Sequence, residues 1–280
     1  MTVNIGNHDG TILWEGVYSF ALSDYPDISR WELKKLLAFM RYEKAHGRET
    51  EIVCDNAGIM LAVEEAIARP ATVADAVIPE KITECTACKQ KGCLTEFVCH
   101  TAEIENAKKI FAGGKLLSAL KASGKPIEEL IADKRNGAGD PEDYFAYIMF
   151  SWGNCIAGDS LATERAFVRR RGRLPSQKEL DKENKKRLIP GVRFYFRHGD
   201  IIKHPGYVFD GYHPAKIKDE LVLADWLCAC VVPEEYREAL AGAVPESIAD
   251  RVYVLRRDDL GIWDWSEKAY GFVKKQVPPY

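Results

Sequence analysis

The sequence predicts an α+β protein in which a small α/β unit over residues 1–96 precedes a larger, strand-rich domain over residues 97–280. Three observations support this prediction. Residues 97–119 read as a short strand followed directly by an amphipathic helix. Beyond this segment, β-prone runs recur at 191–197, 220–233 and 251–255. In the first ninety residues, by contrast, two capped helices alternate with short strands.

Both helices of the amino-terminal unit have start and stop signals. Ser29 and Glu32 form a capping-box pattern ahead of a helix that Gly47 ends, and Asn56 can cap a second helix that Pro70 closes. The strands of this unit are expected near 11–21 and over 51–54. Apolar residues at helical spacing predict the buried faces, with Leu33, Leu36, Leu37 and Met40 in the first helix and Ile59, Val63 and Ile67 in the second.

The segment 97–119 places a histidine at the junction of a strand and a helix. A β-prone run begins at Phe97, and His100 and Thr101 follow where that strand ends. The next helix spans 103–111 and stops at a Gly-Gly pair, 113–114. Strand ends and helix N-termini present free backbone N–H groups, so this junction suits a nucleotide or another anionic ligand. The alternative is that His100 only caps or packs.

Later segments give further strand and helix signals. A helix is expected over 126–134 and a loop over 136–141, whereas the aromatic run 143–152 fits either a buried helix or a strand. The aromatic tail 261–272 is expected to pack back on the body of the protein.

Composition describes an ordinary globular protein without a global basic field. Hydrophobic residues make up 46% of the chain and charged residues 29%, with a net charge of −3. No apolar run approaches the ~20 residues of a membrane-spanning helix, and the amino terminus lacks the pattern of a secretion signal. We therefore expect a cytoplasmic protein with no membrane contact, whose eight cysteines serve as thiols or metal ligands.

Residues 164–187 are the one strongly charged run. They are a candidate surface for tracking the phosphates of DNA or RNA. The alternative is a solvated helical segment with a turn at Pro175, in which Ser176 and Glu179 form another capping box. The basic residues are Arg165, Arg169, Arg170, Arg171, Arg173, Lys178, Lys182, Lys185, Lys186 and Arg187.

Two further features favour a site in the second domain. Glu220 opens an apolar strand, where a carboxylate is costly unless something compensates it, although an exposed strand edge would also explain it. The loop 203–214, which carries His204 and His213, leads into that strand. Its position suits recognition of an acceptor, whereas lone loop histidines are more often plain surface residues.

A cysteine cluster precedes the second domain. Cys85, Cys88 and Cys93 have the spacing to supply thiolates to one tetrahedral zinc ion, which would tie the amino-terminal unit to the strand at 97. Cys99, Cys54 or His46 would complete such a set. Unligated thiols and an iron–sulfur cluster are the alternatives.

Three short motifs in order resemble the ADP-ribosyltransferase fold. HTAEIENAKKIFAGGKLLS resembles its opening motif, and VRFYFRHGD is similar to the aromatic strand of DarT-type enzymes, which modify DNA. ELVLADWLCACVVPEEY has the general shape of the third motif, a strand that starts with the catalytic glutamate. The resemblance covers roughly residues 97–240 and implies a split β-sheet core with helices.

The resemblance implies a role for each matched residue. His100 would hydrogen-bond the ribose next to adenine with support from Thr101, and Glu220 would stabilise the reacting ribose. Tyr195 or Phe194 would pack near the nicotinamide, and Arg197 would bind the diphosphate or steady the acceptor. Because side chains alternate along a strand, Tyr195 and Arg197 must share one face and Phe194, Phe196 and His198 the other. His198 is therefore an alternative to Arg197.

The predicted function is transfer of ADP-ribose from NAD to a macromolecule, with a nucleic acid as the favoured acceptor, and release of nicotinamide. The alternatives are an NAD glycohydrolase and a non-catalytic, metal-stapled protein that binds nucleic acid. About ninety residues separate the histidine motif from the aromatic strand, so an inserted element that includes the basic run is expected between them.

Overall fold

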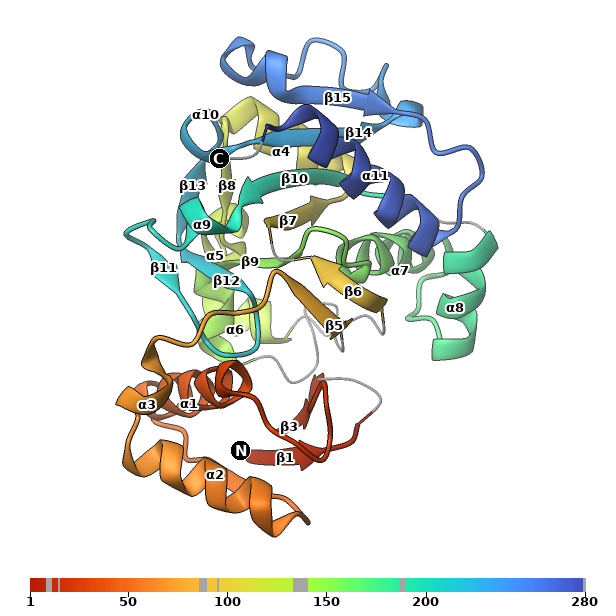
Figure 1. The fold of residues 1–280 in the computed structure, drawn as a ribbon. Coiled ribbons are helices and arrows are strands. Elements are labelled where there is room, and N and C mark those ends of the chain that lie inside the picture. The colour runs from red at the N-terminus through yellow and green to blue at the C-terminus, as the bar shows by residue number, and fades with distance from the viewer. Residues whose placement is uncertain are drawn as a thin grey trace.

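The computed structural model describes residues 1–8, 12–14, 16–85, 90–94, 96–132, 141–186 and 190–278. It is a mixed α+β protein, with a small sheet near the amino terminus and a larger sheet beyond it. Figure 1 shows the amino-terminal unit in red and orange at one end of the molecule. No helix in the described ranges has both the length and the apolar character needed to cross a membrane.

The amino-terminal unit is a four-stranded sheet of order β2-β3-β1-β4 with three helices. Its hydrophobic core joins β1, β3, α1 and α2. The elements are β1 (Thr2–Gly6), β2 (Ile12–Trp14), β3 (Val17–Ala21), α1 (Arg30–Ala45), β4 (Glu51–Val53), α2 (Ala57–Ala68) and α3 (Ala71–Ala74). A hairpin of β5 (Lys81–Cys85) and β6 (Gln90–Leu94) follows.

The predicted caps of this unit are confirmed. The hydroxyl of Ser29 and the carboxylate of Glu32 form a capping box at the start of α1, and the Asn56 side chain accepts from two backbone N–H groups of α2. Two expectations were wrong. β1 was not foreseen, because its alternating pattern lies in a short polar segment. Ile67 is 42% exposed rather than buried, since Ala66 turns toward the core in its place.

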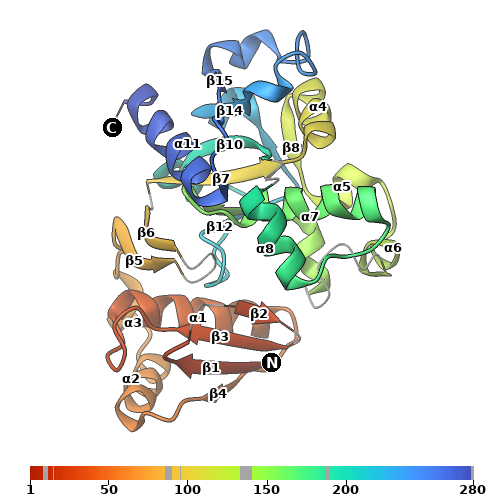
Figure 2. The ribbon, with the colours of Figure 1, turned by 90° about the vertical axis from the view of Figure 1, so that its right-hand side faces the viewer.

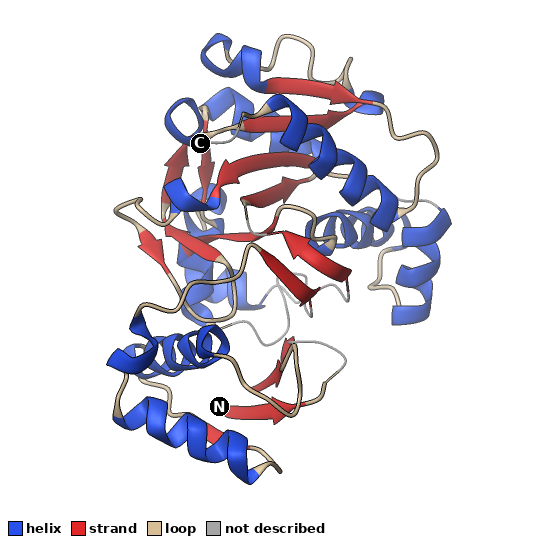
Figure 3. Cartoon of the chain, viewed as in Figure 1, coloured by secondary structure: helices blue, strands red, loops and turns tan. Residues whose placement is uncertain are grey.

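The larger sheet has seven strands in the order β11-β12-β9-β7-β10-β14-β15. Figure 3 shows strands in red and helices in blue. Neighbouring strands run antiparallel except β14 and β15. The bounds are β7 (Phe97–Ala102), β9 (Tyr147–Trp152), β10 (Val192–Arg197), β11 (Tyr207–Val208), β12 (Ala215–Lys218), β14 (Ala229–Pro233) and β15 (Val252–Leu255). The aromatic run 143–152, for which the sequence allowed either a helix or a strand, forms a short 3-10 turn, η1 (Glu142–Ala146), followed by β9.

Helices and a second small sheet cover the seven-stranded sheet. The predicted helix after His100 is α4 (Ile104–Gly113), and Gly114 ends it with a φ of 63° in the left-handed region. The two-stranded sheet pairs β8 (Lys115–Leu117) with β13 (Glu220–Val222). The remaining elements are α4 (Ile104–Gly113), α5 (Ala119–Ser123), α6 (Ile127–Ala132), α7 (Ala157–Arg171), α8 (Gln177–Lys186), α9 (His198–Ile201), α10 (Leu223–Trp226), η2 (Glu234–Tyr236), η3 (Glu246–Arg251) and α11 (Ile262–Gln276).

The two faces of the seven-stranded sheet pack against different elements, as the positions of α4 and α11 in Figure 2 show. Phe111 of α4 and Leu221 of β13 pack in one core with Phe194 and Phe196. Tyr195 belongs to the other core, which α11 completes. The aromatic tail therefore packs back on the body as expected, and the alternation predicted for β10 is confirmed.

Helix α1 lies between the amino-terminal sheet and the rest of the protein (Figure 2). The loop before β12 contacts α1 so closely that a Cβ on Gly211 would lie 2.0 Å from the carbonyl oxygen of Lys35. Gly211 also has a φ of 74°, and its own carbonyl oxygen accepts a hydrogen bond of 3.0 Å from the hydroxyl of Tyr18. Only glycine fits this position without moving the backbone of α1.

The side chain of Lys216 is buried among three tyrosine rings at the same junction. The Lys216 ammonium is fully buried, 3.9 Å from the ring centroid of Tyr42, 3.8 Å from that of Tyr144 and 4.7 Å from that of Tyr147. The Asp210 carboxylate lies 3.1 Å from its Nζ. Because Tyr42 belongs to α1 and Lys216 to β12, this cage, defined by Tyr42, Tyr144 and Tyr147, joins the two parts of the chain.

Candidate functional site

Glu220 stands at the point where the chain leaves the seven-stranded sheet. Strand β12 ends at Lys218, and β13 begins at Glu220 as a partner of β8 in the separate two-stranded sheet. The turn between them is Asp219, a non-glycine residue with a φ of 67°. Such a conformation is strained for a side chain with a Cβ and is held here by two backbone hydrogen bonds, from Asp219 N to Ala146 O and from Ser118 N to Asp219 O.

Two lysines face the Glu220 carboxylate. Lys115 Nζ lies 3.1 Å and Lys121 Nζ 3.9 Å from Glu220 Oε2, and the glutamate side chain is 42% exposed. The hydrogen bond from Lys115 and its charge lower the pKa of Glu220 below its ordinary value. The carboxylate is therefore ionised at neutral pH and open to solvent. These lysines were not foreseen, because contacts between β8 and β13 are set by topology rather than by sequence spacing.

His100 lies in the middle of β7, between β9 and β10. Its Nδ1 donates a hydrogen bond of 3.2 Å to the carbonyl oxygen of Met149, which leaves Nε2 as the acceptor. Its ring packs edge-on against Phe150 at 6.2 Å. Burial lowers the pKa of His100, so the imidazole is neutral at pH 7. The ring shares its face of the sheet with Phe194, its cross-strand neighbour, and with the core onto which β13 packs.

Thr101 and Tyr195 point to the opposite face from His100. The Thr101 side chain fills the space beside two glycines, since a Cβ on Gly158 or Gly191 would lie 2.4 or 2.3 Å from it. Tyr195 is fully buried in the core with α11. The expectation that these two residues share one ligand cleft with His100 is therefore not met, because successive strand residues alternate in direction. The side chains on the His100 face are those of Phe194 and Phe196.

A buried ion pair between α7 and β10 lies beside Tyr195. Arg193 Nε donates to Asp159 at 2.9 Å, and its Nη1 donates to the hydroxyl of Tyr195 at 3.2 Å. The other Asp159 oxygen accepts from Gly191 N at 2.8 Å. Both charged side chains have no exposed surface. We did not foresee this pair, although an arginine inside an aromatic strand is a signal that a buried acid must lie opposite.

Arg197 also lies away from the His100 face. Its guanidinium is 5.5 Å from the ring centroid of Phe97 and donates to the carbonyl oxygen of Pro278 near the carboxyl terminus. Its neighbour His198 points to the other side, 5.1 Å from the ring of Trp152, and burial lowers its pKa. Of the two residues proposed to bind phosphate, His198 is thus the one on the same face as His100.

Residues 164–186 of the basic run lie in the helical hairpin of α7, α8 and the turn between them, with the expected capping box at Ser176. Arg187 lies outside the described residues. Four of its arginines face carboxylates. Arg165 and Arg169 pair with Glu103, Arg170 pairs with Glu183, and Arg173 pairs with Glu179. Exposed basic residues remain at Arg171, Lys178, Lys182 and Lys185. The hairpin lies between the first two motifs, and both its status as an inserted element and its contact with nucleic acid stay predictions.

The zinc prediction falls largely outside the described residues. Cys88 is not among them, and of Cys85 and Cys93 only the backbone, in β5 and β6, is described. In the described part of the chain no group of three His, Cys, Asp or Glu side chains could hold a metal ion. Cys54 and Cys99, two of the residues suggested as a fourth ligand, are unpaired thiols.

No protein-family model, curated protein or solved structure matches the chain.

Proposed function

We propose that the protein transfers ADP-ribose from NAD to a nucleic acid, and that the seven-stranded sheet and the β8–β13 sheet form an ADP-ribosyltransferase-like split core. The observation that carries the proposal is the placement of Glu220. An ionised, solvent-accessible carboxylate sits at a strained turn where one strand passes from the larger sheet to the smaller one. The first motif supports binding of the donor, NAD. Its histidine, His100, is half-buried and neutral, precedes an amphipathic helix, and lies on the face of the sheet that β13 covers.

In this reaction the bond between the nicotinamide nitrogen and C1′ of the ribose breaks, and its electron pair leaves with nicotinamide. Positive charge develops on the ribose, and the Glu220 carboxylate stabilises it mainly in the transition state. A nucleophilic atom of the acceptor then bonds to C1′ and gives its proton to Glu220. His100 Nε2 would accept a hydrogen bond from a ribose hydroxyl. Water as the acceptor would give free ADP-ribose instead.

The direct test is incubation of the purified chain with NAD labelled in its adenylate part, together with single-stranded DNA, RNA or a protein mixture. We expect nicotinamide release and label on the nucleic acid. Label on protein alone would contradict the nucleic-acid part of the proposal, and nicotinamide release without labelling would indicate a glycohydrolase. Absence of both NAD binding and turnover would leave the non-catalytic alternative.

The alternation of β7 and β10 predicts different effects for two substitutions. His100→Ala should weaken NAD binding about tenfold, since a hydrogen bond to substrate contributes about 0.5–1.5 kcal/mol. Tyr195→Phe should leave NAD binding unchanged, because its hydroxyl bonds to Arg193 on the opposite face. Titration of NAD followed by calorimetry measures both. A larger loss of NAD affinity in Tyr195→Phe than in His100→Ala would show that NAD binds on the Tyr195 face of the sheet, and would contradict the proposed site.

Lys115 gives a pH-dependent test of Glu220. It lowers the pKa of Glu220, so the wild-type rate should stay high as pH falls to the ordinary range of a glutamate, near 4.5. Removing the ammonium in Lys115→Met raises that pKa. The acidic limb of kcat/KM should therefore move to higher pH in the variant, and Lys115→Arg should restore it. If the acidic limb of kcat/KM falls at the same pH in the wild type, Lys115→Met and Lys115→Arg, Glu220 is not the group that must be ionised.

A further inference from the structure

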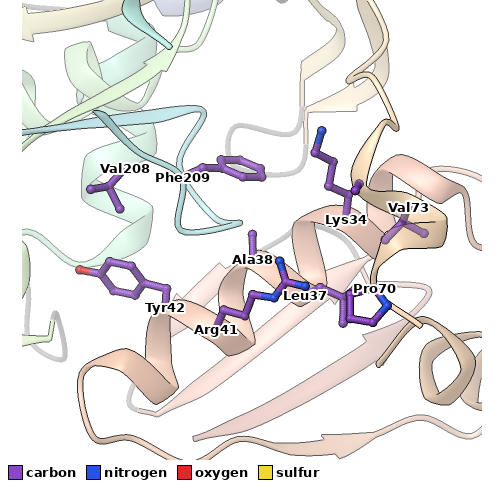
Figure 4. A pocket seen from close by; sticks show the side chains of 10 residues that line it. Lys34, Leu37, Ala38, Arg41, Tyr42, Pro70, Val73, Val208 and Phe209 are labelled. Atoms are coloured by element: carbon purple, nitrogen blue, oxygen red, sulfur yellow. The ribbon is translucent and has the colours of Figure 1, made fainter. Parts of the chain in front are cut away.

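A pocket of about 460 Å³ lies between the amino-terminal unit and the larger sheet. Its floor is α1 with α3 at one side, and the loop after β11 forms the opposite wall, where Phe209 faces α1 (Figure 4). The lining combines apolar side chains with two cations, Lys34 and Arg41. Neither Glu220 nor His100 lines it, so it is separate from the candidate reaction site.

The wall that carries Phe209 is held rigidly. The next residue, Asp210, is fully buried and accepts hydrogen bonds from the backbone N–H groups of Tyr212 and His213, at 3.0 and 2.8 Å. It also lies 3.1 Å from the ammonium of the caged Lys216. Gly211 then touches the backbone of α1. Because these contacts tie the loop to α1 and to β12, the position of this wall does not depend on a bound ligand.

The lining suits a flat ring attached to an anion. Phe209 is half-buried and offers a ring for stacking, while Leu37, Ala38 and Val73 provide apolar surface. Arg41 is exposed, and no carboxylate in the described part of the chain lies within 4.0 Å of its guanidinium. The Lys34 ammonium bonds to the carbonyl oxygen of Ala76 at 2.7 Å and likewise has no carboxylate partner there. An aromatic ring beside unneutralised cations is the chemistry that binds unstacked nucleotides.

The pocket is connected to Glu220 through a single strand. The loop that carries Phe209 enters β12 at Ala215, and Glu220 follows the other end of β12. Four strand residues span roughly 13 Å. Phe209 and Glu220 are therefore joined through opposite ends of the same strand, which suits a second subsite along a nucleic-acid strand rather than the place where the acceptor reacts.

We propose that this pocket binds an unpaired nucleotide of the single-stranded nucleic acid acceptor, with the base against Phe209 and the phosphate at Arg41 and Lys34. As an acceptor site it rests on the proposed function. A free nucleotide offers the same chemistry, a nucleobase with its phosphate. The experiment below distinguishes a free nucleotide from a nucleotide of the single-stranded acceptor.

The test measures binding of a short fluorescent single-stranded oligodeoxynucleotide to the full chain by anisotropy. Phe209→Ala and Arg41→Glu should each weaken binding about tenfold, because the first removes the stacking surface for one base and the second replaces a cation at the phosphate with an anion. Ala38→Phe should fill the pocket and weaken binding without removing a charge. Arg237→Glu, an exposed arginine in the segment after η2, is the matched control and should bind almost as the wild type does. Circular dichroism and thermal melting check that each variant is folded.

The outcomes separate the pocket from the reaction. Unchanged oligonucleotide binding in the folded Phe209, Arg41 and Ala38 variants would overturn the pocket, even if Glu220→Gln abolishes ADP-ribose transfer. Weaker binding in these variants without any NAD turnover by the wild type would support a nucleotide pocket and refute the proposed function. A nucleoside monophosphate that binds as tightly as the oligonucleotide would identify a free nucleotide as the ligand and overturn the acceptor assignment.

Discussion

Glu220→Gln should abolish ADP-ribose transfer while the protein remains folded. The substitution removes the negative charge and keeps nearly the same side-chain volume. Loss of one electrostatic group aimed at a developing charge typically costs about 10²–10³ in rate, so at least a hundredfold loss in kcat is expected. NAD affinity should change little, because the carboxylate acts mainly on the transition state. Nicotinamide release under saturating NAD measures kcat, and calorimetry measures affinity.

Two controls make this result specific. Glu128→Gln removes a carboxylate from an exposed position on α6 and should keep the wild-type rate. Glu220→Asp keeps the charge but shortens the side chain, and it should retain partial activity. Unfolding of Glu220→Gln should match that of the wild type, because its ion pairs with Lys115 and Lys121 are exposed to solvent. Full transfer activity in the glutamine variant would refute the assignment of Glu220.

Asp159→Ala should destabilise the protein more than any surface substitution. It leaves the Arg193 guanidinium charged and unpaired in the core, and removing one partner of a buried pair costs about 3–5 kcal/mol. The backbone N–H of Gly191 also loses its acceptor. Urea-induced unfolding followed by circular dichroism measures the difference in the free energy of unfolding.

The double variant Asp159→Ala/Arg193→Met tests the reason for the loss. With the charge gone from both positions, much of the stability should return. Arg173→Ala, which breaks an exposed pair with Glu179 in the helical hairpin, should change the unfolding midpoint little. Equal stability of the Asp159 variant and the wild type would mean that the pair is not buried in solution.

Local features of the fold could be predicted from the sequence because their causes are local. The capping box at Ser29, the Asn56 cap and the glycine stop of α4 each depend on residues within a few positions of one another. The alternation along β10 follows from strand geometry alone and is confirmed. It also shows that a histidine and the threonine after it cannot both face one cleft from the middle of a strand.

The surroundings of the candidate site could not be predicted, because they depend on pairing between distant segments. The partner of Glu220 is Lys115, about a hundred positions earlier, and only the pairing of β13 with β8 brings them together. The pocket beside Phe209 depends on how α1 docks against the second part of the chain, for which no short motif exists. The pairing of Arg193 with Asp159 likewise requires the helix packing to be known.

The tyrosine cage around Lys216 makes the two halves of the chain interdependent. A shortened protein that began at residue 97 would lack Tyr42, and one side of a buried cation would open to water. It would also lack Arg48, which pairs with Asp143 at 2.6 Å. The strand that leads to Glu220 carries this lysine, so trimming the amino-terminal unit would disturb the geometry of the distant carboxylate. Truncated variants for functional assays should therefore keep the amino-terminal unit.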